Sequence, residues 1–178
     1  TAQLDFDVRN DNDRDEPVTS ASRATDMYGY AAHADVAIDV GRARLIPGLR
    51  FDGYLLGGKP RYSLDPRLVA RYALDDHWTA KGYIGLFHQP PQPEALDEQF
   101  GNPDLGLEWA VHTGLGGEWK PTKLWTADAE VYYIDRNDLV EFTQDATVDP
   151  MTGELDPVNF RNSRIGDTIG LEVLIKRE

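Results

Sequence analysis

Three aspartates near the start of the chain have the alternate spacing of residues that bind calcium. Asp11, Asp13 and Asp15 match the first, third and fifth ligand positions of a calcium-binding loop. Such a loop needs glycine at its sixth position and glutamate at its twelfth, where this chain has Glu16 and Ser22. We therefore predict a solvated acidic loop and no metal site, and we keep a divalent-cation site on these aspartates as the alternative.

Two histidines could bind haem or a ferric ligand. His33 and His112 each lie on the polar side of a stretch in which polar and apolar residues alternate. If both stretches belong to one barrel wall, both histidines face its interior. We favour the other interpretation, in which each is a single histidine hydrogen-bonded to a plug inside the barrel or to neighbouring strands.

No catalytic motif accompanies these residues. The sequence has no cysteine, no Gly-x-Ser-x-Gly, no His-Glu-x-x-His and no phosphate-binding glycine-rich loop. The glycine-rich residues 114–117 lie at the end of a predicted strand, where small barrel residues explain them better than a cofactor turn. We therefore expect neither enzymatic activity nor a bound cofactor.

Composition and charge restrict the class of protein further. A length of 178 residues predicts one domain, and a net charge of -13 argues against a nucleic-acid partner, which requires a basic face. No apolar run approaches the roughly 18 residues of a membrane helix. The chain is therefore either soluble or crosses a bilayer as strands. Its first residues lack the basic start and apolar stretch of a signal peptide, and we favour an interior piece of a longer protein.

Polar and apolar residues alternate through nearly all of the chain outside the loops. A period of two indicates β-strands, and we find no helical segment. The predicted fold is all-β, an antiparallel up-and-down transmembrane β-barrel segment of about eight strands, with residues 1–178 as a single partial domain. The predicted strands are 2–9, 28–40, 44–55, 67–74, 78–87, 107–115, 125–133 and 168–176.

The lengths of the predicted connections also alternate. Tight turns are expected at 41–42, 75–77 and 120–122, whereas longer polar or proline-rich loops are expected at 10–26, 57–65, 89–104 and 142–162. Transmembrane barrels have short periplasmic turns and long extracellular loops. The pattern therefore favours a membrane barrel over a soluble sandwich.

Large aromatic residues fall beside the expected tight turns. Trp78, Trp119 and Trp125 each share the apolar parity of their strand, which predicts an aromatic girdle at the periplasmic interface. On the same face, near the long-loop ends, a second girdle could be formed by Tyr28, Tyr30 and Tyr133.

Several local phrases resemble the C-terminal half of the barrel in TonB-dependent receptors. Residues 45–52 look like the strand that reads "PGLRYD" in this family. Residues 65–68 resemble "SPRL", with which the family's next strand begins. Residues 79–87, followed by Pro90, resemble the "LKAxYGxGFxxP" strand, and 101–108 resemble "NPDLKPE". Asn162 followed by residues 170–172 is similar to "N…GxE". The order and spacing of these phrases make the match specific.

This resemblance implies a barrel of 22 strands around a plug, of which the chain supplies about eight. It also implies import of a scarce nutrient ligand, such as a siderophore, a metal chelate or a vitamin, across the outer membrane of a Gram-negative bacterium. The expected partners are outer-membrane lipid and an inner-membrane TonB-type protein that acts through the absent plug.

The alternation predicts which side chains face the lumen and which face lipid. We expect Leu49, Phe51, Trp109, Val131, Leu171 and Val173 on the outer wall. The lumen charges could line a ligand path or form ion pairs that seat the plug. The lumen candidates are Arg50, Arg71, Lys81, His33, His112, Asp128, Glu130 and Glu172, with Arg44 and Arg67 as further charges on this face.

Two other classes of protein remain open at the level of sequence. One is a self-contained eight-stranded structural or adhesive barrel, which would close on itself and end in a terminal aromatic. The other is a soluble ligand-binding barrel, which would turn its apolar face inward. Both first and last strands of this chain should instead have edges made for absent neighbours.

Overall fold

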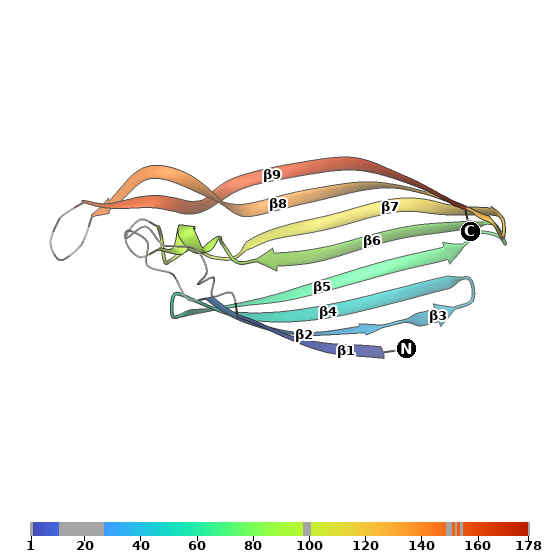
Figure 1. Ribbon diagram of the computed structural model, residues 1–178, viewed down its shortest axis with the longest axis horizontal. Helices are drawn as coiled ribbons and strands as arrows, with labels where there is room; N and C mark the ends of the chain where they lie inside the picture. Colours follow the sequence, from blue (N-terminus) through green and yellow to red (C-terminus); the bar gives the residue numbers. More distant parts are fainter. Residues whose placement is uncertain are drawn as a thin grey trace.

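The computed structural model describes residues 2–10, 27–97, 101–148, 151, 153 and 155–177, which form one antiparallel sheet (Figure 1). The order along the sheet is β1-β2-β4-β5-β6-β7-β8-β9, and the short β3 pairs with β4. The strand bounds are β1 (Ala2–Asn10), β2 (Met27–Val36), β3 (Ile38–Val40), β4 (Ala43–Leu56), β5 (Lys59–Ala73), β6 (Trp78–Gln89), β7 (Glu108–Thr122), β8 (Trp125–Val148) and β9 (Leu155–Arg177).

The all-β, up-and-down prediction is confirmed, because the strands follow one another across the sheet in sequence order, with only the short β3 beside this path. One turn of 3-10 helix, η1 (Pro93–Leu96), was not expected from the sequence. It begins at a proline, whose fixed φ suits a first helical turn. None of the described residues forms a helix that is long and apolar enough to cross a membrane.

The expected continuous strand at 28–40 is interrupted at Ala37, between β2 and β3. The register against β4 is the same on both sides of the interruption, since Asp35 faces Gly48 and Ile38 faces Leu45. Side chains therefore keep their predicted faces through this break.

The prediction of a long loop at residues 57–65 is wrong. Residues Gly57 and Gly58 alone connect β4 to β5, and Leu56 pairs directly with Lys59. Both glycines have positive φ, 53° and 78°, which is the conformation that two-residue hairpin turns require. The next strand therefore begins at Lys59, well before the predicted residue 67.

Two further connections differ from the prediction. The expected loop at 142–162 is largely strand, because β8 and β9 continue as a paired hairpin to Val148 and Leu155. Register shifts between Arg136 and Asp145 break the alternation on which the prediction relied. The expected turn at 120–122 is also strand, and the turn lies at residues 123–124. Figure 1 shows the β8–β9 hairpin extending beyond the loop ends of the other strands.

The buried apolar cluster lies at one end of the sheet, where the loop between β6 and β7 is found, and not along its middle. We call this end of the sheet the loop end and the opposite end the turn end. The cluster joins Met27 and Leu56, at the ends of β2 and β4, to Ala95, Leu96 and Leu105 of the loop between β6 and β7. That loop therefore packs against strands that are not its immediate neighbours.

The first and last strands, β1 and β9, form opposite edges of the sheet (Figure 1). Within the described ranges they do not pair with each other. The sheet is therefore open, and these residues do not close into an eight-stranded barrel.

Candidate functional site

One face of the sheet is apolar and solvent-accessible. Leu115 and Ile169 are each 74% exposed, and the side chains that alternate with them are more buried. Large exposed apolar patches mark surfaces that contact lipid or protein. Of the six residues expected on the outer wall, five are exposed and Trp109 is partly buried; the five are Leu49, Phe51, Val131, Leu171 and Val173.

The opposite face has ion pairs that cross intervening strands. Asp35 of β2 and Arg67 of β5 meet over Gly48 of β4, with two hydrogen bonds of 3.0 and 2.5 Å. Gly48 is the residue opposite both of them in the sheet register. A Cβ atom there would lie 2.0 Å from Asp35 Oδ1, so only glycine leaves room for the pair.

The same arrangement recurs further along the sheet. Lys81 of β6 reaches over Gly116 of β7 to Asp128 and Glu130 of β8, at 2.6 and 3.3 Å. Gly116 faces both Lys81 and Glu130 in the register. These side chains are well shielded from solvent, which strengthens such pairs relative to exposed ones. Glu172 of β9 lies directly opposite Glu130.

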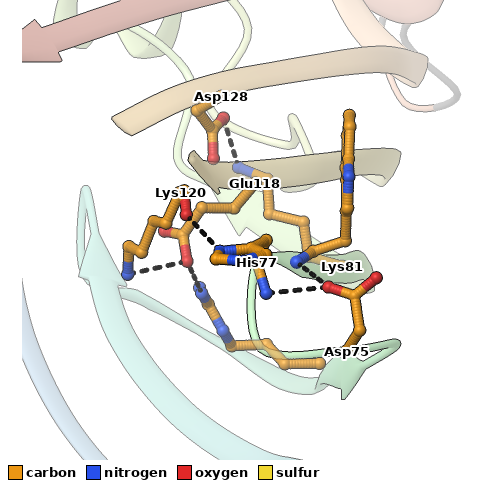
Figure 2. Close-up of polar contacts among 8 residues, drawn as sticks. Asp75, His77, Lys81, Glu118, Lys120 and Asp128 are labelled. Carbon is orange, nitrogen blue, oxygen red and sulfur yellow. Dashed lines mark hydrogen bonds and ion pairs between the residues drawn. The ribbon is translucent and has the colours of Figure 1, made fainter. Parts of the chain in front are cut away.

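A third group of polar contacts links the β5–β6 turn to the end of β7 (Figure 2). Glu118 contacts both Arg71, at 3.2 Å, and Lys120, at 2.9 Å. The ring of His77 lies 2.9 Å from the carbonyl oxygen of Lys120, and the backbone N–H of Lys120 donates to His77 O. This turn is thereby fastened to the neighbouring hairpin.

Asp75 shapes the turn itself. Its carboxylate accepts the backbone N–H groups of His77 and Trp78 at 2.7 and 2.8 Å. These two bonds hold the pKa of the Asp75 carboxyl below its usual range, and the bond from His77 has the larger effect.

Two acidic residues near the loop end are buried and paired. Arg50 donates two hydrogen bonds of 2.7 Å to Asp52, which is only 3% exposed. Asp65 binds the backbone N–H and the ring of His88, at 3.1 and 2.5 Å. The β5–β6 ladder ends beside Pro66, which has no N–H to donate, and the Asp65 carboxylate takes over the connection.

The sheet brings some of the candidate residues together and separates others. Among the charged residues named from the sequence, Lys81, Asp128 and Glu130 pair with one another. Arg44, Arg50, Arg67 and Arg71 pair instead with acidic residues that the sequence did not single out. His33 and His112 are held apart, because β4, β5 and β6 lie between their strands. His33 lies 3.9 Å from Asp35, whereas the His112 ring contacts Phe87 at 4.6 Å. A two-histidine site is therefore not formed.

The aspartates at 11, 13 and 15 lie outside the described residues. Within the described part of the chain, no group of three or more His, Cys, Asp or Glu residues is arranged to hold a metal ion.

A cavity of about 270 Å³ opens where the start of β7 separates from β8. The β7–β8 ladder begins at Trp109 and Asn137, and β8 then changes register beside Asp138, which has a positive φ of 54°. The cavity is lined by residues of β6, β7 and β8, among them Phe87, Gln89, Glu108, Ala110, His112 and Arg136. No sequence pattern indicated this cavity, whose lining residues Arg136 and Leu139 flank a register shift.

The loop between β6 and β7 is anchored on both sides of this region. Lys59 Nζ contacts Asp104 at 2.5 Å, and this ion pair lowers the pKa of the Asp104 carboxyl. On the other side, Asn162 of β9 accepts the Gly106 N–H at 2.7 Å and donates to Asp138 O at 2.7 Å. Asn102 donates to the carbonyl of Phe160 at 2.8 Å. The described residues 101–107 of this loop are thereby fixed to β5 on one side and to β9 on the other, and we call them the strap.

The three tryptophans lie on the apolar face near the turns. Trp78 and Trp119 face each other across β6 and β7, with stacked rings 5.6 Å apart. Trp125 begins β8, and the Arg177 guanidinium lies 5.6 Å from its ring centroid. All three are between 41% and 46% exposed, so their rings are available to an apolar environment.

Comparison with known families identifies the class of this chain. Residues 1–174 match the family described as TonB dependent receptor-like, beta-barrel. The chain belongs to this family, as the sequence resemblance predicted. A comparison with curated proteins gave no match.

Solved structures with the same fold are outer-membrane receptors and transporters. The siderophore receptor PirA from Acinetobacter baumannii superimposes with a TM-score of 0.63 at 17% identity, over 85% of this chain and 25% of that one. The R480A mutant of the ferric enterobactin receptor PfeA from Pseudomonas aeruginosa, solved with enterobactin, has a TM-score of 0.67 at 20% identity. This match covers 84% of this chain and 24% of that one. The copper transporter OprC has a TM-score of 0.61 at 17% identity, over 88% of this chain and 27% of that one.

These similarities establish the fold, a segment of an outer-membrane β-barrel. The chain spans about a quarter of the length of the proteins that it matches.

Proposed function

We propose that this chain forms part of the wall of a TonB-dependent receptor that imports a scarce nutrient across the outer membrane of a Gram-negative bacterium. The observation that carries the proposal is the division of the sheet into an exposed apolar face and a face of shielded ion pairs. Lipid favours the first face, and a polar lumen favours the second.

The ligand that we propose is a metal chelate such as a siderophore, with a vitamin as the alternative. Proteins of similar fold are named as siderophore receptors, an iron transporter and a copper transporter. The family is described as receptor-like, and we propose that the chain has a role in transport and no enzymatic activity.

We assign different roles to the two ends of the polar face. Near the turns, the pairs made by Arg71, Lys81 and Asp128 stiffen the wall, because their charges are already satisfied within the sheet. Ligand contact falls to the loop end, around the cavity and the strap. An inner-membrane TonB-type partner would act through a plug on the lumen side.

Uptake by cells tests this proposal. A strain lacking the gene for the whole receptor is grown under iron, copper or vitamin limitation, and the gene is restored with and without a functional TonB-type partner. We expect restored uptake of one nutrient only when both are present. Equal uptake of every nutrient without the energy-coupling partner would contradict active import.

Single cysteines test the facing of the wall, because the natural chain has none. Val173→Cys and Glu172→Cys differ by one position and should differ in face. We expect a water-soluble thiol reagent to modify Glu172→Cys and a lipid-confined reagent to modify Val173→Cys. The reverse result would place the polar face against lipid.

A further inference from the structure

The cavity between β6, β7 and β8 contains Arg136, which differs from four other arginines of the polar face in having no carboxylate partner among the described residues. Within the described part of the chain, Arg61 also donates only to carbonyl groups, but it lies outside this cavity. Arg44, Arg50, Arg67 and Arg71 each contact a carboxylate. Arg136 instead donates to the Thr168 hydroxyl at 2.9 Å. Among the residues that the structure describes, no carboxylate lies within ion-pair distance of Arg136.

Small neighbours leave space beside this guanidinium. In the sheet register Arg136 stands between Ala110 of β7 and Gly166 of β9. Ala110 is followed across the sheet by Phe87 of β6. Phe87 and Arg136 therefore stand on either side of a residue with only a methyl side chain, and the cavity lies among these three side chains.

Two of the other polar side chains that line the cavity differ in whether they already make hydrogen bonds within the described part of the chain. Glu108 accepts the Val140 N–H at 2.7 Å with one oxygen and Gln89 Nε2 at 2.6 Å with the other. Its carboxylate is thus bound at both oxygens. The His112 ring contacts Phe87 and offers its edge as a further hydrogen-bonding group.

We propose that this cavity is a recognition site for an anionic oxygen group carried on a planar ring, such as an aromatic carboxylate that forms part of a larger ligand. A guanidinium presents a planar fork that matches a carboxylate with two hydrogen bonds. The rings of Phe87 and His112 provide a stacking surface beside it.

The volume of the cavity fits one ring rather than a whole ligand. It measures about 270 Å³, below the range of roughly 300–1,000 Å³ for pockets that enclose a drug-sized molecule. The site would hold one group of a chelate whose remainder lies in the lumen. The inference rests on the proposed import function only in assigning that group to the imported ligand.

Binding of benzoate and benzamide to the purified whole receptor in detergent tests the site. The two probes have nearly the same shape, and only benzoate is charged. We expect benzoate to bind with a Kd on the order of 1 mM, as is usual for a fragment of this size, and benzamide to bind at least about tenfold more weakly.

Three variants locate the site. Arg136→Gln should weaken benzoate binding about tenfold or more, because a charge-assisted pair is lost. Ala110→Leu should fill the cavity and exclude both probes. Arg161→Gln is the matched control, since Arg161 lies on β9 outside the cavity and the change removes the same charge from its pair with Glu141 of β8. It should bind benzoate as the natural protein does.

Folding of each variant is checked by its shift in gel mobility on heating. If Arg136→Gln folds poorly, Arg136→Lys replaces it, and the loss of the planar fork should still weaken benzoate binding measurably. Equal binding of benzamide, or unchanged benzoate binding in the Arg136 and Ala110 variants, would overturn the inference.

The assay needs no energy-coupling partner, which separates its failure from failure of the proposed import. Benzoate binding without nutrient uptake would count against import alone. Nutrient uptake without benzoate binding would count against this site alone.

Discussion

Asp35 and Arg67 form an ion pair across a strand to which neither belongs. They lie on β2 and β5, and they meet over Gly48 of β4. The pair joins three strands on the polar face without any side chain from the middle strand. A barrel wall gains lateral connections in this way, in addition to the backbone hydrogen bonds of each strand pair.

Gly48→Ala should therefore destabilise the folded barrel. The new Cβ would lie 2.0 Å from Asp35 Oδ1 and 2.8 Å from Arg67 Nε, so the pair must move apart or the strand must shift. Overpacking of this kind costs about 1–3 kcal/mol. The measurement is the free energy of unfolding of the whole receptor in detergent.

Gly29→Ala is the matched control on the adjacent strand. A Cβ at Gly29 would meet the Tyr54 ring at 3.5 Å, an ordinary van der Waals distance. Its free energy of unfolding should change by less than about 1 kcal/mol, and in the stabilising direction, because Gly is the less favourable of the two residues within a strand. Equal destabilisation by the two substitutions would show that the Asp35–Arg67 pair is not the cause.

Alternation in the sequence predicted the faces of the strands correctly where the register is regular. Lys81, Asp128 and Glu130 share one face because Gly116 stands opposite Lys81 and Glu130 without any shift. The pairing of Lys81 with both acids was not predictable, since it depends on how closely β6 and β8 approach across a glycine.

Prediction failed where local chemistry overrides the period of two. The sequence pattern predicts a loop that begins at Gly57-Gly58, although two glycines are also the residues that a two-residue hairpin needs. In β8, the register shifts after Arg136 break the alternation of polar and apolar residues. The sequence pattern therefore missed about a dozen strand residues beyond that point. The cavity is lined by Arg136 and Leu139, which flank the first of those shifts, and the sequence pattern did not indicate either feature.

The Asp75 turn should loosen in acid. Its pKa is lower in the folded state than the roughly 3.9 of an unfolded aspartate. The charged carboxylate therefore stabilises the fold fully above that unfolded value, and this stabilisation is lost as pH falls through the folded-state pKa. We expect protection of the His77 and Trp78 amides from hydrogen exchange to drop below about pH 4.

Asp75→Asn keeps an acceptor oxygen but removes the titrating group. Its amide protection should be lower than that of the natural protein at neutral pH and should not change further in acid. The neighbouring Asp76→Asn is the control, and it should follow the natural profile. A pH-dependent loss of protection in Asp75→Asn would assign the transition to another group.

Asn162 should decide whether the strap stays in place. Its side chain accepts the Gly106 N–H and donates to the Asp138 carbonyl. Asn162→Ala leaves both backbone groups without these partners, which costs about 1–3 kcal/mol when such groups are shielded from water. Hydrogen exchange at Gly106 should accelerate about tenfold or more.

Asn137→Ala is the comparison for this change. Asn137 Nδ2 is buried and has no hydrogen-bond partner among the described residues. Its removal should leave exchange at Gly106 unchanged. If both variants release the strap equally, a general weakening of the β8–β9 hairpin explains the result better than the loss of two specific hydrogen bonds.

The last prediction concerns Trp119, which we place at the membrane interface on the turn side. Its ring stacks on Trp78 with centroids 5.6 Å apart, and it is 41% exposed on the apolar face. An indole suits a headgroup interface because its body is apolar while its N–H can meet water. Such a residue stabilises the barrel through its ring and through the depth at which that ring lies.

Trp119→Phe keeps an apolar ring and should reduce stability in lipid by about 1 kcal/mol, since part of the stacking with Trp78 remains. Trp119→Asp removes the stacking, worth about 0.5–1.5 kcal/mol, together with the apolar ring, and it adds a charge that costs up to about 1 kcal/mol near an interface. Its cost should therefore exceed that of Trp119→Phe. The measurement is the free energy of folding of the whole receptor into vesicles, with the same variants unfolded in detergent for comparison. Because detergent lacks a fixed headgroup plane, the difference between Asp and Phe should be larger in vesicles. Equal differences in both environments would mean that Trp119 acts through packing on Trp78 alone, and that the interface lies elsewhere on the wall.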